Sequence, residues 1–331
     1  MIKLLKSQSN MIRHTFEQDS DKERLDIAIK RHCEELSRSA IQAYIKNGSV
    51  SVNQTIITTP KHIVNTNDLI EYQFEPQVQC TDLPEARTLE KAYEDEHLVV
   101  INKPAGLTVH PGAGQNAGTL LNALLHDYPN NSDLPQAGMV HRLDKDTTGL
   151  MIVAKTLEAH TKLTAMMQKR KIKRQYLALV TGRVLQPGTI DEPLARHSHN
   201  RQKFAVHPYG RQAITHFTIA ERFLHFTLLN VALETGRTHQ IRVHMSHIKH
   251  AIVGDQKYKP QLKFKKGVIT PEFEKIIRSF SRQALHATRL AFEHPITKNS
   301  IDVKCPTPQD LEQLLAAVRS EDEAQHGKKH Q

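Results

Sequence analysis

Apolar and polar positions along the first quarter of the chain predict two short helices followed by short strands. In "RLDIAIKRH", which begins at Arg24, the side chains of Leu25, Ala28 and Ile29 fall on one helical face. The stretch "SRSAIQAYIKNGSVSVN" begins a second helix at a serine cap, and Gly48 ends it. "SVSVN" and "LIEYQF" then alternate as half-buried strands do.

Residues 89–318 mix strand-like and helix-like patterns. "GTLLNALLHDY" places its leucines and Tyr128 on one stripe, which predicts an amphipathic helix. Apolar runs predict strands at residues 98–102, 150–154, 176–181, 214–219 and 226–233.

Two polar segments mark the predicted boundaries. "PQVQCTDLPEART", residues 76–88, is rich in proline and polar residues and predicts a linker between a domain at residues 1–75 and a second one at 89–318. We expect about the first 20 residues of the first domain to be flexible. "RSEDEAQHGKKHQ", residues 319–331, offers nothing to bury, so we expect a disordered tail.

Composition favours a nucleic-acid partner inside the cell. The 331 residues carry a net charge of +10, a balance that suits a polyanion. Residues 1–75 hold as many acidic as basic side chains, so the excess lies downstream. The three cysteines have no metal or disulfide spacing, and no signal-like or membrane-spanning apolar run occurs. We therefore expect a soluble, cytoplasmic protein.

Neither a nucleotide loop nor a metal site is indicated. The glycines of "HPGAGQNAGT" miss the GxGxxG spacing and instead suggest a tight turn before a helix at Thr119. His239, His244, His247 and His250 cluster in the sequence, but no carboxylate or thiolate is placed to share a metal with them. We expect neither a metal nor a cofactor.

A run of cations follows a predicted helix whose apolar face includes Leu163, Met166 and Met167. We interpret the run as cations that close a helix C-terminus, with RNA contact as an additional role. Its members are Lys169, Arg170, Lys171, Lys173 and Arg174.

The most unusual stretch is "VHRLDKDTTGLMIVAKT", residues 140–156, where charged residues precede an apolar run that predicts a buried strand. If residues 140–146 are extended, Arg142, Asp144 and Asp146 share one side. We expect Asp146 to cap the turn through "TTG", as aspartate readily does. Asp144, beside an arginine, is then left as an ionised nucleophile or base.

Four segments resemble the RluA-type family of RNA pseudouridine synthases across residues 89–318. They are "GMVHRLDKDTTGLMIVAKT", "KRQYLALVTG", "LETGRTHQIRVHMSHIKHAIVGDQKY" and "RQALHATRLAFEHP". The segments "ERLDIAI", "SRSAIQAYIKNGSVSVN" and "TPKHIVNTNDLIEY" resemble the alpha-L RNA-binding fold. The resemblance implies an α+β architecture, with a mixed, largely antiparallel catalytic sheet preceded by a small alpha-L domain.

The resemblance also implies roles for individual residues. The essential aspartate of the family falls on Asp144, its active-site tyrosine on Tyr176 and its ion-pairing arginine on Arg242. Further positions implied to act in base flipping or substrate binding are Arg142, His141 and Leu285. In the alpha-L segment, the candidates for phosphate contacts are Arg38, Lys46 and Lys61.

The activity implied by this likeness is isomerisation of uridine to pseudouridine in large-subunit ribosomal RNA, without cofactor, membrane or obligatory protein partner. The carboxylate either attacks C1′ or removes a proton from C2′, and the sequence leaves both routes open. Other ribosomal or transfer RNA uridines are alternative targets. An RNA N-glycosylase and a catalytically silent ribosome-assembly factor are alternative functions.

Overall fold

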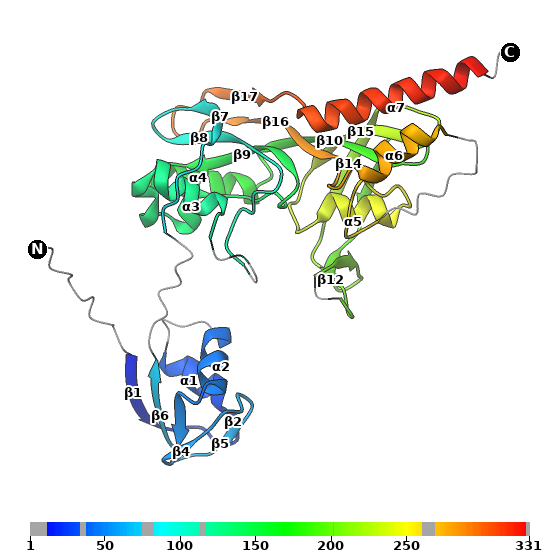
Figure 1. Ribbon diagram of the computed structural model, residues 1–331. Coiled ribbons are helices and arrows are strands. Elements are labelled where there is room, and N and C mark those ends of the chain that lie inside the picture. The colour runs from blue at the N-terminus through cyan, green and yellow to red at the C-terminus, as the bar shows by residue number, and fades with distance from the viewer. Residues whose placement is uncertain are drawn as a thin grey trace, which may run out of the picture. The chain divides into compact units, whose positions relative to one another are not determined.

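The chain consists of two compact units, Met1–Cys80 and Thr81–Gln331, and their division lies inside the predicted linker (Figure 1). This computed structural model describes residues 12–33, 38–74, 83–112, 115, 117–200, 202–259 and 269–328. The serine cap predicted for the second helix and most of the linker lie outside these residues.

The first unit packs two helices on a small antiparallel sheet with strand order β1-β6-β3-β4, beside a separate β2-β5 pair. Its helices are α1 (Leu25–His32) and α2 (Arg38–Lys46). Its strands are β1 (Ile12–Glu17), β2 (Glu23–Arg24), β3 (Val50–Val52), β4 (Thr55–Ile56), β5 (Ile63–Val64) and β6 (Leu69–Phe74). Gly48 follows α2 with a φ of +79°, the left-handed conformation in which helices commonly end.

A buried carboxylate ties the two helices of the first unit together. Asp26, which is fully buried, accepts hydrogen bonds from Arg24 and from Arg38, each with a nitrogen–oxygen distance of 3.0 Å. Part of the charge of Arg38 is therefore used inside the unit. Lys46 and Lys61 are exposed, and a phosphate-binding role for these three cations stays a prediction.

The second unit is built on a sheet of order β11-β14-β15-β10-β16-β9-β8-β7, with β17 also paired to β16. Every pair is antiparallel except β16 with β9, which is parallel. The sheet strands are β7 (Glu90–Glu94), β8 (Leu98–Lys103), β9 (Thr148–Ala154), β10 (Lys173–Thr181), β11 (Gly188–Asp191), β14 (Ile214–Arg222), β15 (Phe226–Leu233), β16 (Leu285–Glu293) and β17 (Ser300–Lys304). A separate hairpin joins β12 (Leu194–Arg196) to β13 (Phe204–Val206).

Helices cover both faces of this sheet, and β9 is buried throughout because it faces two cores. Met151 and Val153 belong to the larger core, whereas Leu150 and Ile152 belong to a second one. The helices are α3 (Leu120–Asp127), α4 (Leu157–Gln168), α5 (Gln240–His247), α6 (Pro271–Ser279) and α7 (Gln309–Lys328), with 3-10 turns η2 (Pro129–Asp133) and η3 (Pro135–Gly138).

The predicted mixed fold with a largely antiparallel sheet is confirmed, and all five predicted strands of the second unit are present. The helix predicted after the glycine loop begins at Leu120, with Thr119 and Asn122 forming a reciprocal capping box. In the part of the chain that is described, no helix has both the length and the apolarity to span a bilayer.

The expectation of a disordered tail from residue 319 is wrong for its described part, because α7 continues to Lys328 (Figure 1). Val318 is the last of the buried apolar residues in this helix, so the apolar pattern does stop where predicted. Beyond it, however, the carboxylate of Glu321 accepts hydrogen bonds from the backbone N–H and the hydroxyl of Thr270, at 3.0 and 2.6 Å. Thr270 is the N-cap of α6, so polar contacts replace apolar burial here.

The interpretation of residues 169–174 as cations that close a helix is also partly wrong. Helix α4 ends at Gln168 with Lys169 at its C-cap, but Lys173 and Arg174 already belong to strand β10. The chain turns between them because Arg170 adopts a left-handed conformation, with φ +57°, and Ile172 is buried. Arg174 is consequently an inward-facing strand residue rather than a surface cation.

Glu321→Ala should lower the free energy of unfolding by about 1–3 kcal/mol, because it leaves the capping threonine of α6 without its carboxylate acceptor. Urea denaturation followed by circular dichroism measures the change. Glu323→Ala, an exposed position on the same helix, is the control and should change stability by no more than about 0.5 kcal/mol. Equal effects of the two substitutions would mean that α7 is not docked through Glu321.

Candidate active site

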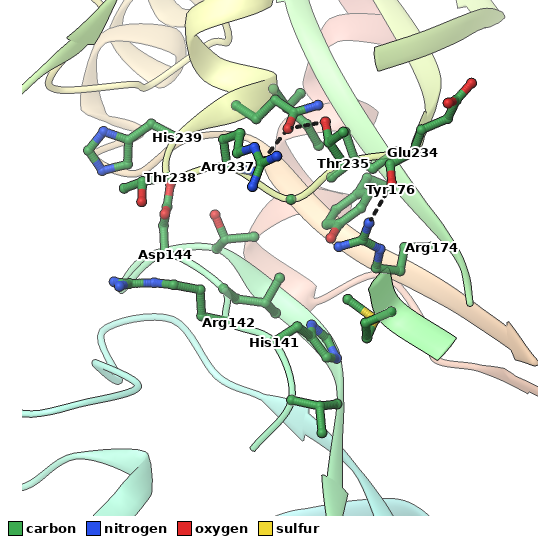
Figure 2. A pocket seen from close by; sticks show the side chains of 18 of the residues that line it. His141, Arg142, Asp144, Arg174, Tyr176, Glu234, Thr235, Arg237, Thr238 and His239 are labelled. Carbon is green, nitrogen blue, oxygen red and sulfur yellow. Dashed lines mark hydrogen bonds between the residues drawn. The ribbon is translucent and has the colours of Figure 1, made fainter. Parts of the chain in front are cut away.

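The six residues that the resemblance implied for catalysis, base flipping or substrate binding all line one cavity of about 670 Å³ in the second unit. Asp144 comes from the loop before β9, Tyr176 from β10, Leu285 from the start of β16 and Arg242 from α5. Figure 2 shows Asp144 and Tyr176 on different walls of this cavity, with the loop of residues 234–239 along one side. The sheet order explains the meeting, since β10, β16 and β9 are neighbours.

The loop that carries Asp144 is not extended to residue 146, contrary to our expectation. The Thr147 N–H donates to the Asp144 carbonyl at 3.1 Å, so residues 144–147 form a tight turn. Arg142 and Asp144 line the cavity, but Asp146 does not. The turn therefore separates the two carboxylates that an extended chain would have gathered, and Asp144 is the one left in the cavity.

Gly149 permits the close strand contact that holds this loop in place. Its φ is +111°, and a Cβ at this position would lie 2.2 Å from the Ala287 carbonyl oxygen. Only glycine fits such a conformation and approach without displacing backbone. Because β9 can then pair directly with β16 at Gly149 and Ala287, the turn and Leu285 are brought to the same edge of the sheet.

A single guanidinium joins two carboxylates at the base of the site. Arg242 Nη1 donates to Asp144 Oδ2 at 2.8 Å, while its Nε and Nη2 donate to the two oxygens of Asp255 at 2.6 and 2.9 Å. The Asp144 side chain is 15% exposed, whereas those of Arg242 and Asp255 are 6% and 0% exposed. Asp144 is thus the most exposed member of the triad and the only one of its two carboxylates that lines the cavity.

Asp255 is itself fixed, which makes the triad rigid. Its Oδ1 accepts the backbone N–H groups of Lys257 and Tyr258 at 2.8 and 2.9 Å. Burial raises the pKa of Asp255, but the hydrogen bonds and charge of Arg242 outweigh this and lower the pKa overall. Burial likewise lowers the pKa of Arg242, but Asp255 and Asp144 reverse the effect and raise the pKa, so the guanidinium stays charged.

Two further groups surround this guanidinium. The ring centroid of Tyr258 lies 5.2 Å from the Arg242 Cζ, a cation–π distance, and its hydroxyl is 2.8 Å from His239 Nδ1. Burial lowers the pKa of His239 to about 4, so this imidazole is neutral at pH 7. No second positive charge therefore competes with Arg242 for Asp144 from that side.

A buried lysine supports the turn from behind. Lys103, 1% exposed, donates through Nζ to the carbonyls of Pro104, Leu107 and Lys145 at 2.8, 3.0 and 2.9 Å. The last of these bonds holds the residue next to Asp144. Burial is the main cause that lowers the pKa of Lys103 to about 7, and the charges of Asp146 and Asp144 oppose it.

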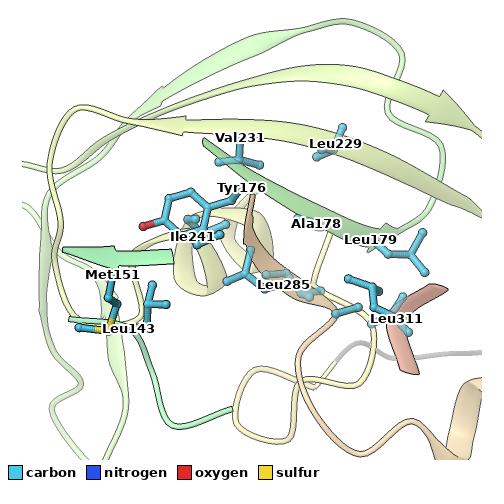
Figure 3. Close-up of a cluster of buried hydrophobic side chains, with 14 of the residues drawn as sticks. Leu143, Met151, Tyr176, Ala178, Leu179, Leu229, Val231, Ile241, Leu285 and Leu311 are labelled. Atoms are coloured by element: carbon cyan, nitrogen blue, oxygen red, sulfur yellow. The ribbon is translucent and has the colours of Figure 1, made fainter. Parts of the chain in front are cut away.

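An apolar surface faces the carboxylate. Tyr176 is 5% exposed and belongs to the same buried cluster as Leu285 and Ile241 (Figure 3). Burial raises the pKa of Tyr176, and the charge of Arg174 opposes the rise, so the phenol is neutral at pH 7. The ring and the two aliphatic side chains form a surface on which a flat heterocycle can lie.

The two residues before Leu143 differ in their surroundings. Arg142 is exposed at the rim of the cavity (Figure 2). His141 lines the same cavity, but its Nε2 accepts the Ile152 N–H at 3.0 Å, which anchors the loop on β9. Burial, with a smaller contribution from Arg174, lowers the pKa of His141 to about 3, so the ring is neutral.

The cation run divides between the cavity and the surface. Arg170 and Arg174 line the cavity, and Lys169, Lys171 and Lys173 are exposed outside its lining. His244 is buried and hydrogen-bonded to Thr215 and the Glu192 carbonyl, which is a structural role. Among the described residues, no group of three or more histidine, cysteine, aspartate or glutamate side chains is arranged to hold a metal ion.

Sequence reasoning missed Asp255 and Lys103. Asp255 was inside a quoted motif, "VGDQKY", but nothing in the spacing indicates that it pairs with Arg242. Lys103 ends a strand that begins with four apolar residues, directly before Pro104. This was the one available signal, since a lysine there must leave the core or be hydrogen-bonded inside it. The assembled site offers one reachable carboxylate against an apolar face, an arrangement suited to nucleophilic or general-base chemistry on a bound ring.

Comparisons with known proteins find a family match in each unit of the chain. Residues 97–247 match the family described as RNA pseudouridylate synthase, and residues 23–70 match the S4 domain. The chain is 46% identical over 298 residues to "Ribosomal large subunit pseudouridine synthase D" of Haemophilus ducreyi, covering 90% of this chain and 91% of that protein. It is 46% identical over 299 residues to the protein of that name from Escherichia coli O6:H1, with the same coverage.

Solved structures share the fold of the second unit. "Human RNA Pseudouridylate Synthase Domain Containing 4" superposes with a TM-score of 0.55 at 24% identity, covering 70% of this chain and 93% of that one. "Human RNA Pseudouridylate Synthase Domain Containing 1" superposes with a TM-score of 0.52 at 22% identity, covering 70% and 95%. At these identities the likeness concerns the fold alone.

Asp255→Asn should lower the free energy of unfolding by about 1.5–3 kcal/mol, because it weakens the charge-assisted hydrogen bonds that the buried Arg242 makes through Nε and Nη2, while its pair with Asp144 remains. Urea denaturation at pH 7 measures this. The control is Glu221→Gln, which removes the carboxylate of an exposed pair with Arg319 and should cost no more than about 1 kcal/mol. A loss no larger than that of the control would show that Asp255 does not stabilise the triad.

The stability of the protein should depend on pH through Lys103. Between pH 7 and about 10 the unfolded lysine keeps its proton while the folded one loses it, so the unfolded state binds more protons and stability rises with pH. Below pH 7 the lysine is protonated in both the folded and the unfolded state, so its contribution to stability no longer changes with pH. The advantage of the wild type over Lys103→Met should therefore grow by about 1.4 kcal/mol per pH unit above pH 7.

Urea denaturation at pH 7, 8 and 9 tests this dependence. Lys145→Met, an exposed lysine of the same turn, serves as the control and should keep the slope of the wild type. Parallel curves for the wild type and Lys103→Met would contradict the depressed pKa of Lys103.

Proposed function

The chain belongs to the RluA-type RNA pseudouridine synthase family, with an S4 domain preceding the catalytic domain, and from that premise we propose that it isomerises uridines of large-subunit ribosomal RNA to pseudouridine. The observation that carries the assignment to Asp144 is its hydrogen bond to a buried arginine inside a cavity with an apolar wall. Enzymes of this family are isomerases, and the reaction adds and removes no atoms.

The target nucleotide must leave its stack before this site can act on it. Unstacking and unpairing a base costs roughly a few kcal/mol, and a side chain that takes the place of the base offsets part of that cost. Arg142, exposed at the rim, is placed for this role. The cavity volume of about 670 Å³ suits a single everted nucleotide with its sugar.

The chemistry then needs a carboxylate, a surface for the base and exclusion of water. As the bond from C1′ to N1 breaks, Asp144 either attacks C1′, forming an ester bond that breaks again when C5 bonds to C1′, or removes the C2′ proton and returns it at that same step. The uracil turns while held against Tyr176 and Leu285, C5 bonds to C1′, and the C5 proton is lost while N1 gains one. Burial of the site keeps water from C1′, which separates isomerisation from hydrolysis.

Arg242 supports both routes in the same way. Its fixed charge keeps Asp144 ionised and aims the carboxylate oxygens, so little reorganisation is needed when the reaction begins. Asp255 in turn prevents the guanidinium from following the substrate. The carboxylate is thereby held at the position where a sugar carbon arrives.

The likeness to proteins named "Ribosomal large subunit pseudouridine synthase D" supports ribosomal RNA as the substrate, and the S4 domain supports RNA binding. Within that RNA, we infer that the target is the stem-loop at the subunit interface. Four cations directly precede the cavity-lining Arg174 in the chain, and we propose that they contact phosphates and so position the loop. They are Lys169, Arg170, Lys171 and Lys173. A ribosomal RNA substrate supports a location in the cytoplasm.

Asp144→Asn should abolish pseudouridine formation in a ribosomal transcript that contains this stem-loop. Loss of a catalytic nucleophile costs roughly 10⁴–10⁶ in kcat. Carbodiimide-based mapping of pseudouridine, read by primer extension, measures the product. Asp146→Asn, two residues away but outside the cavity, is the matched control and should retain activity within several-fold.

Two outcomes would reject the proposal. The first is continued pseudouridine formation by the Asp144→Asn enzyme. The second is release of free uracil by the wild type, detected by chromatography, which would indicate an N-glycosylase on the same scaffold.

A further inference from the structure

Arg174 is a buried cation that has no carboxylate partner among the described residues. It is 6% exposed, and no described group forms a hydrogen bond with its Nε. Its one hydrogen bond within the described chain is a long contact of 3.5 Å from Nη2 to the Glu234 carbonyl. A desolvated charge costs several kcal/mol unless something compensates it. In the free protein, this compensation is largely missing.

The neighbouring carboxylate is engaged elsewhere. Glu234 pairs with Arg170 at 2.5 Å and with His216 at 2.7 Å, so both of its oxygens have partners. His141, which lies close enough to feel the charge of Arg174, is neutral. The guanidinium is therefore available to a ligand.

The fold reserves space for this guanidinium at the cavity. A Cβ on Gly236 would lie 2.6 Å from Arg174 Nη1, so glycine at this position leaves the arginine its room. Arg174 and Tyr176 are two residues apart on β10 and both line the cavity (Figure 2). The charge of Arg174 is near enough to the Tyr176 ring to lower the pKa of the phenol, although burial, which raises this pKa, has the larger effect.

We propose that Arg174 is a further catalytic residue, which binds the oxygens of the detached uracil and stabilises the negative charge that the ring carries after the bond from C1′ to N1 breaks. This inference rests on the proposed function. The electron pair of the broken bond remains on the uracil, where it is shared by N1 and the two carbonyl oxygens. Arg174 forms no covalent bond. Its ion pair with the ring ends when C5 bonds to C1′ and N1 takes up a proton, because the ring is then neutral.

The position of Arg174 favours the base over a backbone phosphate. A phosphate group remains with the RNA strand at the rim, where Arg142 is exposed. Arg174 instead lies beside Tyr176, on the surface where the uracil is held. A fixed cation in a water-poor site is most effective where charge develops during the reaction, which is the ring rather than the backbone.

The test compares Arg174→Met with the wild type in single-turnover reactions at saturating RNA, on transcripts containing uridine or 5-fluorouridine at the target. With uridine, the rate should fall by about 10²–10³, the usual effect of removing one such stabilising group. Fluorine stabilises the anion of the leaving base, so the deficit with 5-fluorouridine should shrink to about tenfold or less. Fluorine replaces the C5 hydrogen, so the final loss of a proton from C5 cannot occur. This reaction is therefore followed as consumption of 5-fluorouridine by nucleoside mass spectrometry.

Three further variants separate catalysis from structure. Arg174→Lys keeps the charge and should recover part of the rate. Gly236→Ala should slow the reaction by displacing the guanidinium while Arg174 remains. Arg289 lies on β16, the neighbour of β10, and pairs with Asp302 of β17. Arg289→Met should retain the rate of the wild type. Arg289 pairs in register with the exposed Gln175, so it faces away from the cavity.

Stability provides an independent readout. Because Arg174 is a buried cation without an acidic partner, Arg174→Met should melt at the same temperature as the wild type or higher. A lower melting temperature together with equal deficits on both substrates would overturn the proposal in favour of a structural role. Weaker RNA affinity with an unchanged rate at saturation would overturn it in favour of a phosphate contact. An inactive wild type would instead reject the proposed function, and this inference with it.

Discussion

The geometry of the site depends on one shared guanidinium. Arg242 has three nitrogens that face carboxylates, and two of them are used by Asp255, which no substrate reaches. The third holds Asp144. A pair of Arg242 and Asp144 alone would leave the arginine free to reorient whenever the carboxylate reacts. The second carboxylate removes that freedom, so the charge at the centre of the site is set before any substrate arrives.

Three of the buried cations near this centre are compensated in different ways. Arg242 is neutralised by carboxylates, and Lys103 is surrounded by three backbone carbonyls. Arg174 has neither kind of compensation in full. The first two cations hold the loop of Asp144 in place. Since burial penalises all three, the one left uncompensated is the one that a bound ligand can satisfy.

The sequence predicted the elements and the principal site residues better than their local conformations. Apolar runs located the strands of the second unit, because a strand such as β9, which is buried on both faces, has apolar side chains at successive positions. The motif likeness named Asp144, Tyr176 and Arg242, and all three line one cavity. The turn at residues 144–147 was missed because its hydrogen bond depends on the backbone, and nothing in the side-chain pattern records it.

Other failures have a different cause. The tail from residue 319 has no apolar pattern, so a rule based on apolar burial predicts disorder, whereas the carboxylate of Glu321 docks it on Thr270. Arg174 was grouped with surface cations because the run of charges conceals an alternation in which Ile172, Arg174 and Tyr176 all face inward. In both cases, the conformation depends on contacts with residues that are far away in the sequence. Asp255 belongs here too, because its importance follows only from its distance to Arg242.

The one parallel strand pair explains why these distant segments meet. In an antiparallel sheet, neighbouring strands begin at opposite edges, but β9 and β16 run in the same direction and both begin beside the cavity. The loop of Asp144 therefore enters next to Leu285, and β10, antiparallel to β16, brings Tyr176 opposite Ala287 at the same level. Gly149 is the residue that allows this pairing, since any side chain there would meet the β16 backbone. The arrangement of residues around the cavity thus follows from the sheet order together with one close backbone contact.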